Sequence, residues 1–339
     1  MTTASSNNHN ANSPVVSVIM PAYCVAQYIG QAVNSVFRQT FTDYEIIVVN
    51  DGSPDTDELE RVLAPHRERI VYLKQKNAGV SAARNSAINI ARGRYLALLD
   101  PDDWWEPGYL AVEVGKLDSD PTIDVFYPNA FLVGDPLTAG KTYMDLSPSE
   151  GEVTFESLIT ERCQVPIFVT MRAEIVKRAG MFDESLRISQ DFDLWLRLVK
   201  LGGRIAYTRQ VLVHRRRRPE GLSSDEIALC KDILLIFDKA GRIFDLNPAE
   251  RKVLETEQTR RRALLELCQG KQAFLDGNVR MALHHLTRAN ASLRSPKIEA
   301  IIIALRAAPR LLVRVHETRE RLRAMGSRMI DRSLPSLSK

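Results

Sequence analysis

Three closely spaced carboxylates follow an apolar run in the first third of the chain, and they are the side chains best placed to do chemistry. Residues 95–99 are apolar apart from one tyrosine hydroxyl, and Asp100, Asp102 and Asp103 come directly after them. Carboxylates this close repel one another unless a cation relieves them. Mg²⁺ and Mn²⁺ prefer carboxylate oxygens together with the oxygens of a substrate phosphate. The cluster therefore predicts a metal-bound phosphate.

The position of these acids in the predicted fold supports a binding site. The run over residues 93–99 is short and almost wholly apolar, which predicts a buried parallel strand. Ligands of open α/β sheets bind at the carboxyl ends of the strands, where the three acids would lie. The alternative is an Asp-rich turn that caps a helix opening at Trp104 and Trp105, and taken alone the cluster favours neither interpretation.

The elements that must position the acids alternate between strand and helix patterns. Strands are expected over residues 15–20, 44–49, 70–73 and 93–99, and helices over residues 26–39, 57–66 and 81–91. Such alternation predicts a parallel βαβ series and an α/β fold. The first strand is not followed by the glycine-rich motif of dinucleotide-binding enzymes or of P-loop NTPases, which argues against both classes.

Composition divides the chain into two parts. The net charge of +4 combines −6 over residues 1–249, with 27 basic and 33 acidic side chains, and +10 over residues 250–339, with 19 and 9. Two structural units with different partners are therefore expected. The four cysteines lack metal-site spacing, which indicates a reduced cytoplasmic protein, and residues 1–14 predict a disordered tail instead of a signal peptide.

Four ordered motifs at the predicted strand ends resemble glycosyltransferase family 2. They are Pro21-Ala22-Tyr23, Asn50-Asp51-Gly52-Ser53, the segment Asn77–Asn85, and Leu99–Asp103. The resemblance covers residues 15–224 and implies an inverting, nucleotide-sugar-dependent transferase with the GT-A fold. That fold is a Rossmann-like, mostly parallel sheet flanked by helices, followed here by an all-α extension over residues 225–339. Cys24 departs from the family, which commonly has Asn after the Tyr.

The resemblance assigns roles to residues of these motifs. Nucleotide-binding positions are Pro21, Ala22, Tyr23, Asp51, Arg84 and Asp100, and the metal positions are Asp102 and Asp100. An Asp51 oxygen can accept from the imide N–H of uracil, and the Tyr23 ring offers a flat face to a base. Arg84, near a helix start, can meet a diphosphate. The alternatives are a plain turn for residues 50–53 and a solvated surface arginine.

Asp191 begins a predicted amphipathic helix near the same edge of the sheet. One apolar face of that helix contains Phe192, Trp195, Leu198 and Val199. The family places its general base at the Asp of a Glu-Asp pair here, so the resemblance makes Asp191 the catalytic base, whereas Gln190 replaces the usual Glu. Capping of the helix start would also explain an Asp at this position.

The basic segment after the strand expected at residues 211–214 is a further candidate. The resemblance favours a mobile loop that closes over the diphosphate, with His214, Arg215 and Arg218 as candidate contacts. A solvated loop is the alternative, and an RNA-binding role lacks aromatic stacking platforms near the arginines. Residues 134–151 predict a variable loop that faces the acceptor.

The C-terminal part is expected to be wholly helical. Residues 270–289 resemble one tetratricopeptide-like helix pair, which must pack on neighbours to bury its apolar face. The apolar residues 298–305 and the arginines after Pro309 fit either a basic amphipathic helix on an anionic membrane or, with more weight, a solvated helix face.

We therefore predict a glycosyltransferase of the hexosyltransferase type that depends on Mn²⁺ or Mg²⁺ and acts in surface polysaccharide or glycoconjugate synthesis. The expected donor is a nucleoside-diphosphate sugar, with a UDP-sugar as the first choice. The expected acceptor is the hydroxyl of a glycan or of a lipid-linked molecule. No nucleic-acid partner is expected. The expected location is the cytoplasm, with peripheral contact to the inner face of the plasma membrane as a variant. The alternative is a non-catalytic nucleotide-sugar-binding or assembly subunit.

Overall fold

The computed structural model describes residues 13–218 and 225–308, so most of the predicted N-terminal tail, part of the basic loop and the last arginine-rich segment lie outside the described residues. The chain divides into two compact units. The first contains residues 1–224 and 238–254, and the second contains residues 225–237 and 255–339. Residues 238–254 thus belong with the first unit, although they follow the boundary predicted at residue 224.

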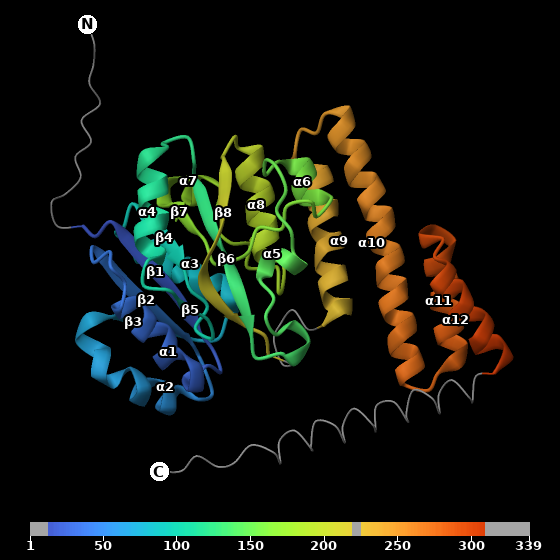
Figure 1. Cartoon of the computed structure of the whole chain (residues 1–339), viewed down its shortest axis with the longest axis horizontal. Coiled ribbons are helices and arrows are strands. Elements are labelled where there is room, and N and C mark those ends of the chain that lie inside the picture. The colour runs from blue at the N-terminus through green and yellow to red at the C-terminus, as the bar shows by residue number, and fades with distance from the viewer. Residues whose placement is uncertain (1–12, 219–224, 309–339) are drawn as a thin grey trace, which may run out of the picture. The chain divides into compact units, whose positions relative to one another are not determined.

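The first unit is built on one mixed sheet of eight strands in the order β3-β2-β1-β4-β7-β6-β8-β5 (Figure 1). The strands are β1 Val16–Ala22, β2 Tyr44–Asp51, β3 Val71–Gln75, β4 Tyr95–Leu98, β5 Trp104–Trp105, β6 Val125–Val133, β7 Thr170–Arg172 and β8 Ile205–Arg216. The predicted parallel series is confirmed, because β1 pairs in parallel with both β2 and β4, and β2 with β3. β4 pairs antiparallel with β7, so the sheet changes direction beside the strand that leads to the acids.

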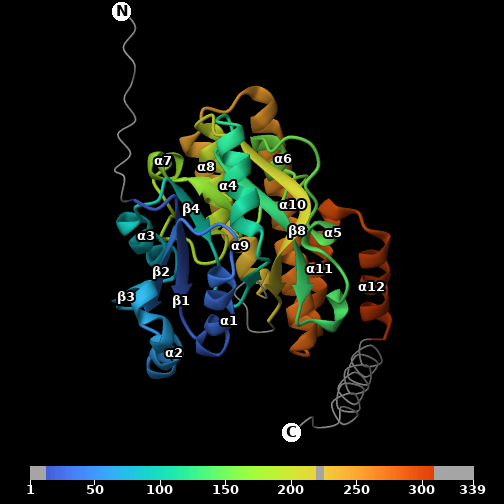
Figure 2. The ribbon, with the colours of Figure 1, turned by 60° about the vertical axis from the view of Figure 1, so that its left-hand side comes forward.

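Helices flank this sheet, and their apolar faces explain why (Figure 2). In the first unit they are α1 Ala26–Phe37, α2 Thr56–Leu63, α3 Val80–Ile90, α4 Tyr109–Ser119, α5 Tyr143–Leu146, α6 Phe155–Ile159, α7 Ala173–Arg178 and α8 Gln190–Lys200, with short 3₁₀ turns η1 Ala64–Arg69 and η2 Pro136–Thr138. In α1 the side chains Ile29, Val33 and Val36 are fully buried at helical spacing. All seven residues of β1 are buried, as expected for a strand covered on both faces.

The alternative interpretation, in which a helix begins at Trp104, is wrong. Trp104 and Trp105 form β5, which pairs antiparallel with β8 through His214 and Val213. The helix α4 begins only at Tyr109, after Pro107, and Trp105 is buried in a stacked contact with Tyr109 whose ring centroids are 4.0 Å apart. Burial of the large Trp105 side chain and pairing with β8 outweigh the local capping signal.

The second unit contains helices only among its described residues. α9 Glu226–Ile243 and α10 Pro248–Leu275 each run across the unit boundary, and α11 Val279–Leu293 and α12 Pro296–Ala307 follow. Leu286, Ile298, Ile302 and Leu305 form the buried cluster between α11 and α12. A Cβ added at Gly270 would lie 2.9 Å from the Leu286 side chain, so α10 and α11 approach closely where the tetratricopeptide-like pair is expected.

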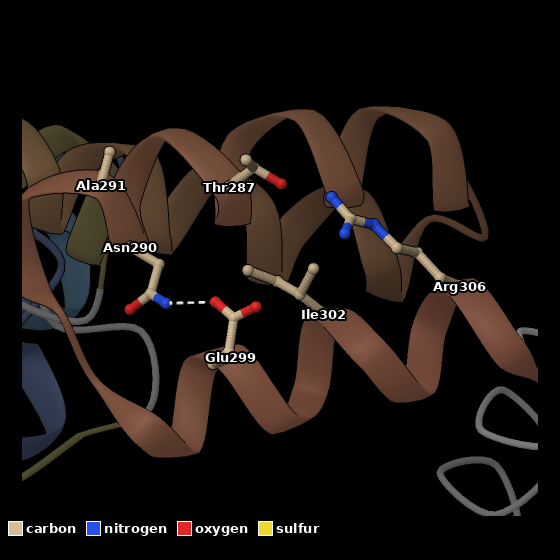
Figure 3. A pocket seen from close by; sticks show the side chains of 6 residues that line it. All are labelled: Thr287, Asn290, Ala291, Glu299, Ile302 and Arg306. Carbon is tan, nitrogen blue, oxygen red and sulfur yellow. Dashed lines mark hydrogen bonds between the residues drawn. The ribbon is translucent and has the colours of Figure 1, made fainter.

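A shallow cavity of about 240 Å³ lies between α11 and α12 (Figure 3). Its lining residues are Thr287, Asn290, Ala291, Glu299, Ile302 and Arg306. The Asn290 amide donates to Glu299 across it at 2.8 Å. None of the described helices is both long enough and apolar enough to cross a membrane.

Candidate functional site

Two of the three acids after β4 pair with an arginine guanidinium, and the third accepts a backbone hydrogen bond. Asp100 pairs with the Arg84 guanidinium at 2.7 Å, and the Arg84 side chain, on α3, is only 3% exposed. Asp102 pairs with Arg218 at 2.7 Å. The buried Asp103 accepts a hydrogen bond from the backbone N–H of Arg216 at 2.7 Å. The fold therefore brings positive groups from α3 and from the end of β8 to one acidic turn.

Burial and repulsion from neighbouring acids act on Asp102 and Asp103. Burial, followed by the nearby charge of Asp100, raises the pKa of Asp102 above its ordinary value, against the opposing effect of Arg218. Burial and then the charges of Asp102 and Asp100 raise the pKa of Asp103 well above its ordinary range. The Asp102 and Asp103 carboxylates are thus destabilised as anions, which a bound cation would relieve.

The donor set fits a divalent metal held together with a phosphate. Asp100 and Asp102 offer hard carboxylate oxygens, which suit Mg²⁺ or Mn²⁺ when substrate phosphate completes the coordination. Among residues 13–218 and 225–308 no group of three or more His, Cys, Asp or Glu side chains forms a protein-only metal site. Two carboxylates beside Arg84 and Arg218 therefore suit a metal–diphosphate pair better than a metal alone.

The Arg84 guanidinium also connects the acids to α8, because it contacts Gln190 at the start of that helix. Gln190 follows Arg84 by 106 positions in the chain. With the Gln190 amide oriented so that both its polar atoms are satisfied, its oxygen accepts from Arg84 at 2.9 Å and its nitrogen donates to the carbonyl of Ile188 at 2.6 Å. The Arg84 guanidinium also lies 5.3 Å from the centre of the Phe182 ring. Arg84 is therefore a buried connector, which differs from the solvated arginine of the alternative interpretation.

Asp191 lies inside the first turn of α8, one residue beyond Gln190. The N-cap position is Ser189, and an Asp191 oxygen accepts from the N–H of Phe192 at 2.8 Å. Burial raises the pKa of Asp191, although the Phe192 hydrogen bond and the charges of Arg84 and Arg215 oppose the shift. The side chain is thus not the helix cap, and its raised pKa makes it a stronger proton acceptor than an exposed aspartate.

Four of the six predicted nucleotide-binding positions, Pro21, Ala22, Tyr23 and Asp51, lie at the ends of β1 and β2. Asp51 is 3% exposed and its carboxylate accepts from the Gln75 amide at 2.8 Å and from the N–H groups of Ala78 and Gly79 at 3.0 and 2.8 Å. It thereby holds the loop that leads into α3. Tyr23 is 48% exposed, so its ring is open to a ligand. Pro21 and Ala22 are the last buried residues of β1.

The backbone conformation at Cys24 explains why Asn would suit this position. Its φ angle is +53°, in the left-handed region that Asn tolerates and most other side chains disfavour. Its N–H donates to the Ser53 hydroxyl at 2.7 Å, which joins the turns after β1 and β2. The family's common Asn therefore suits the backbone here, and Cys is the exception.

The basic residues at and just after the end of β8 lie in three different environments. His214 stacks on Trp104 with ring centroids 4.7 Å apart, and its Nε2 lies 2.6 Å from the Glu106 carboxylate. The Arg215 guanidinium lies 5.3 Å from the centre of the Tyr143 ring. Arg218 is the loop candidate that pairs with Asp102.

Sequence reasoning missed Arg216 and Lys239. Besides its backbone contact with Asp103, Arg216 donates from Nε to the carbonyl of Asp102 at 3.1 Å. Lys239, on α9, binds Asp193 in the first turn of α8 at 2.7 Å. The four consecutive arginines signalled a role for Arg216 without singling it out, whereas nothing near Lys239 in the sequence indicated a contact 46 residues away.

Comparisons with known proteins agree with this arrangement. Residues 17–182 match the family model for glycosyl transferase family 2. An uncharacterized glycosyltransferase of Rickettsia conorii is 31% identical over 65% of this chain and 37% of its own length, and one of Rickettsia typhi is 30% identical over 61% and 65%. The chain thus spans less than two thirds of the length of these relatives. The Escherichia coli chondroitin synthase is 29% identical over 58% of this chain and 29% of its own.

Solved structures show the same fold at low identity. Staphylococcus aureus TarS 1-349 superposes with a TM-score of 0.60 and 19% identity over 86% of this chain and 87% of its own. The Pyrobaculum calidifontis mannosyltransferase PcManGT, solved with GDP-Man and Mn²⁺, gives 0.59 and 20% over 91% and 84%. The domain over residues 17–182 therefore matches glycosyltransferase family 2, and its sheet has the GT-A fold.

Proposed function

We propose that this protein transfers a sugar from a nucleoside-diphosphate sugar to an acceptor hydroxyl with inversion at the anomeric carbon. The observation that carries this proposal is the meeting of Asp100, Arg84 and Gln190, because it brings the acidic turn, α3 and the start of α8 to one place. A leaving-group site and a proton acceptor are thereby neighbours. Proteins of similar fold solved with UDP, UDP-GlcNAc and GDP-Man support a nucleotide-sugar donor, and a UDP-sugar is our first choice.

The donor end of the site binds nucleotide and diphosphate. Tyr23, with its half-exposed ring, would stack on the base, and Asp51 has lone pairs left to accept from a base N–H beside Pro21 and Ala22. Asp100 and Asp102 would hold Mn²⁺ or Mg²⁺. When bound, that metal supplies positive charge to the departing diphosphate. Arg84 and Arg218 already face these two carboxylates, and both can bind phosphate oxygens in the same place.

The acceptor end of the site removes a proton. Inversion requires the acceptor hydroxyl to attack opposite the departing diphosphate, and that hydroxyl holds its proton at neutral pH. Asp191 would accept it, because burial raises the pKa of Asp191 and so strengthens it as a base. The Phe192 hydrogen bond and the charges of Arg84 and Arg215 oppose that shift, so they favour the ionised carboxylate that the step requires. Gln190 contributes no charge to this balance.

The basic end of β8 would help to retain the donor. His214 and Arg215 lie on the strand just before Arg218, and stacking on Trp104 and contact with Tyr143 hold them. We propose that this segment contacts the diphosphate and excludes water from it, since hydrolysis competes with transfer. The acceptor would be a glycan or a lipid-linked hydroxyl of a surface polysaccharide. The protein would work in the cytoplasm, with basic residues after α12 making peripheral contact with the membrane.

The test is a nucleotide-sugar screen of the full-length protein. Thermal unfolding is measured with UDP-, GDP- and dTDP-sugars, each with Mn²⁺, with Mg²⁺ and with chelator. A donor at one hundred times its Kd should add about 2.7 kcal/mol to the free energy of unfolding. Release of nucleoside diphosphate is then followed with glycan and lipid-linked acceptors. Metal-dependent binding with turnover supports the proposal, binding without any turnover supports a non-catalytic subunit, and no binding refutes both.

A further inference from the structure

We propose that Lys239 is a positioning residue that holds the first turn of α8, and with it Asp191, in its working place. The inference rests on the proposed function for the role of Asp191, and it adds a residue that no motif contains. Lys239 lies on α9, in the segment 238–254 that belongs to the same compact unit as the sheet. It is therefore part of the catalytic unit, although it lies beyond the residues that match the family model.

The Lys239 ammonium joins two carboxylates from different segments. Its Nζ lies 2.7 Å from Asp193 and 2.6 Å from Asp183. Asp193 is 3% exposed and binds Arg197 through its other oxygen at 2.8 Å. The contact with Lys239 and the hydrogen bonds from Ser185 lower the pKa of Asp183 to about 2, against its desolvation. Both carboxylates thus contact one partly buried ammonium group.

The start of α8 depends on such contacts because its ordinary cap is missing. The Ser189 hydroxyl, at the N-cap, makes no capping hydrogen bond. Two side chains instead hold the first turn from opposite sides of Asp191 in the sequence. Gln190 is bound by Arg84, and Asp193 is bound by Lys239. Asp191 lies between these two anchored residues, so a loss of either anchor lets its carboxylate move.

Through Asp183, Lys239 also restrains the turn that packs on Arg84. Asp183 lies in the turn after α7, next to Phe182, whose ring contacts the Arg84 guanidinium. Asn85 binds both the N–H and the carbonyl of Phe182, at 3.0 and 2.9 Å. Lys239 therefore fixes both the helix that carries Asp191 and the turn that packs on Arg84.

A second lysine bridge in the same unit provides a matched control. Lys200, at the C-terminal end of α8, binds Glu250 of α10 at 3.1 Å and the carbonyl of Asp245 at 3.1 Å. It too joins α8 to the segment 238–254 through a partly buried ammonium. It lies ten residues from Gln190, at the far end of the same helix. Lys200→Met therefore removes a comparable bridge without touching the first turn.

The experiment compares Lys239→Met and Lys200→Met in the full-length protein. Amide hydrogen exchange is measured by mass spectrometry for peptides over residues 189–194 and 196–201, since exchange reports local opening. We expect Lys239→Met to accelerate exchange at least about tenfold in the first peptide, and Lys200→Met to do so only in the second. Release of nucleoside diphosphate is measured with the donor from the screen. Lys239→Met should lower kcat about 10- to 100-fold with the donor KM within about twofold, because small misplacements of a reacting group cost this much.

Each outcome bears on one claim. The positioning role of Lys239 is refuted if the two variants open residues 189–194 equally, or if they lower kcat by the same factor. A wild-type protein that never releases nucleoside diphosphate refutes sugar transfer. The exchange result still tests whether Lys239 holds the first turn of α8. If Lys239→Met does not fold, Lys239→Gln, which keeps a hydrogen-bond donor without the charge, replaces it and must show the same selective opening.

Discussion

Glu113 offers a direct test of how burial sets charge in this protein. It lies on α4 with no exposed surface, beside Tyr109 and Thr170. Burial raises the pKa of Glu113 well above its ordinary value, and the neighbouring Thr170 offsets only part of that shift. The folded protein therefore keeps a proton on Glu113 at pH values where the unfolded chain has lost it.

The sign and size of the effect follow from this difference in protons. Stability from the protonated Glu113 is fully present below 4.5, the ordinary pKa that applies to the unfolded chain, and is lost as pH rises toward the raised pKa of the folded state. The loss is up to about 1.4 kcal/mol for each pH unit in this window. Glu113→Gln keeps the shape but has no proton to lose. Its free energy of unfolding, relative to wild type, should therefore rise by about 1 kcal/mol between pH 5.5 and 6.5.

Urea denaturation followed by tryptophan fluorescence measures this quantity. All three tryptophans lie in the first unit, so the signal reports the unfolding of the unit that contains Glu113. Other titrating groups are common to both proteins and cancel in the difference. Glu174→Gln, at an exposed position of α7, is the control and should show no such trend. A Glu113→Gln difference that is the same at pH 5.5 and 6.5 would show that the buried carboxyl is not protonated in the fold.

Three further predictions concern the site. Asp102→Ala should abolish the divalent-ion dependence of nucleotide binding in calorimetric titrations. Equal affinities of the wild type with and without chelator would contradict the assignment of a metal to Asp102. Asp191→Asn should lower kcat about 10²- to 10⁴-fold with unchanged donor affinity and melting temperature, and wild-type turnover would refute the base assignment. Cys24→Asn should raise the free energy of unfolding by about 0.5 to 1 kcal/mol because Asn tolerates the positive φ, whereas Cys24→Ala should show no gain.

Part of the site could be predicted because it depends on strand ends. Asp51 and Asp100 follow apolar runs whose length and composition indicate buried strands, and the carboxyl ends of β1, β2 and β4 meet at one edge when these strands pair in parallel. The periodicity of residues 190–200 likewise identified α8 and placed Asp191 near its start.

Local pattern failed where distant partners decide conformation or charge. Trp104 and Trp105 followed an apparent cap signal, but pairing with β8 made them a strand. The partners of the three acids could not be read from the chain, since Arg84 precedes them on α3 and Arg218 comes from the end of β8. Ion pairing depends on distances in space, and sequence spacing does not reveal those distances.

The sequence by itself determined the alternation of strands and helices, the acidic turn and the family motifs, because these depend on side-chain polarity at short range. Only the tertiary structure decided that Gln190 binds Arg84, that Asp191 lies within the helix and not at its cap, and that Lys239 joins Asp183 to Asp193. The physical reason is that burial and long-range pairing set the position and the proton affinity of these groups. Both arise only when segments far apart in the chain pack together.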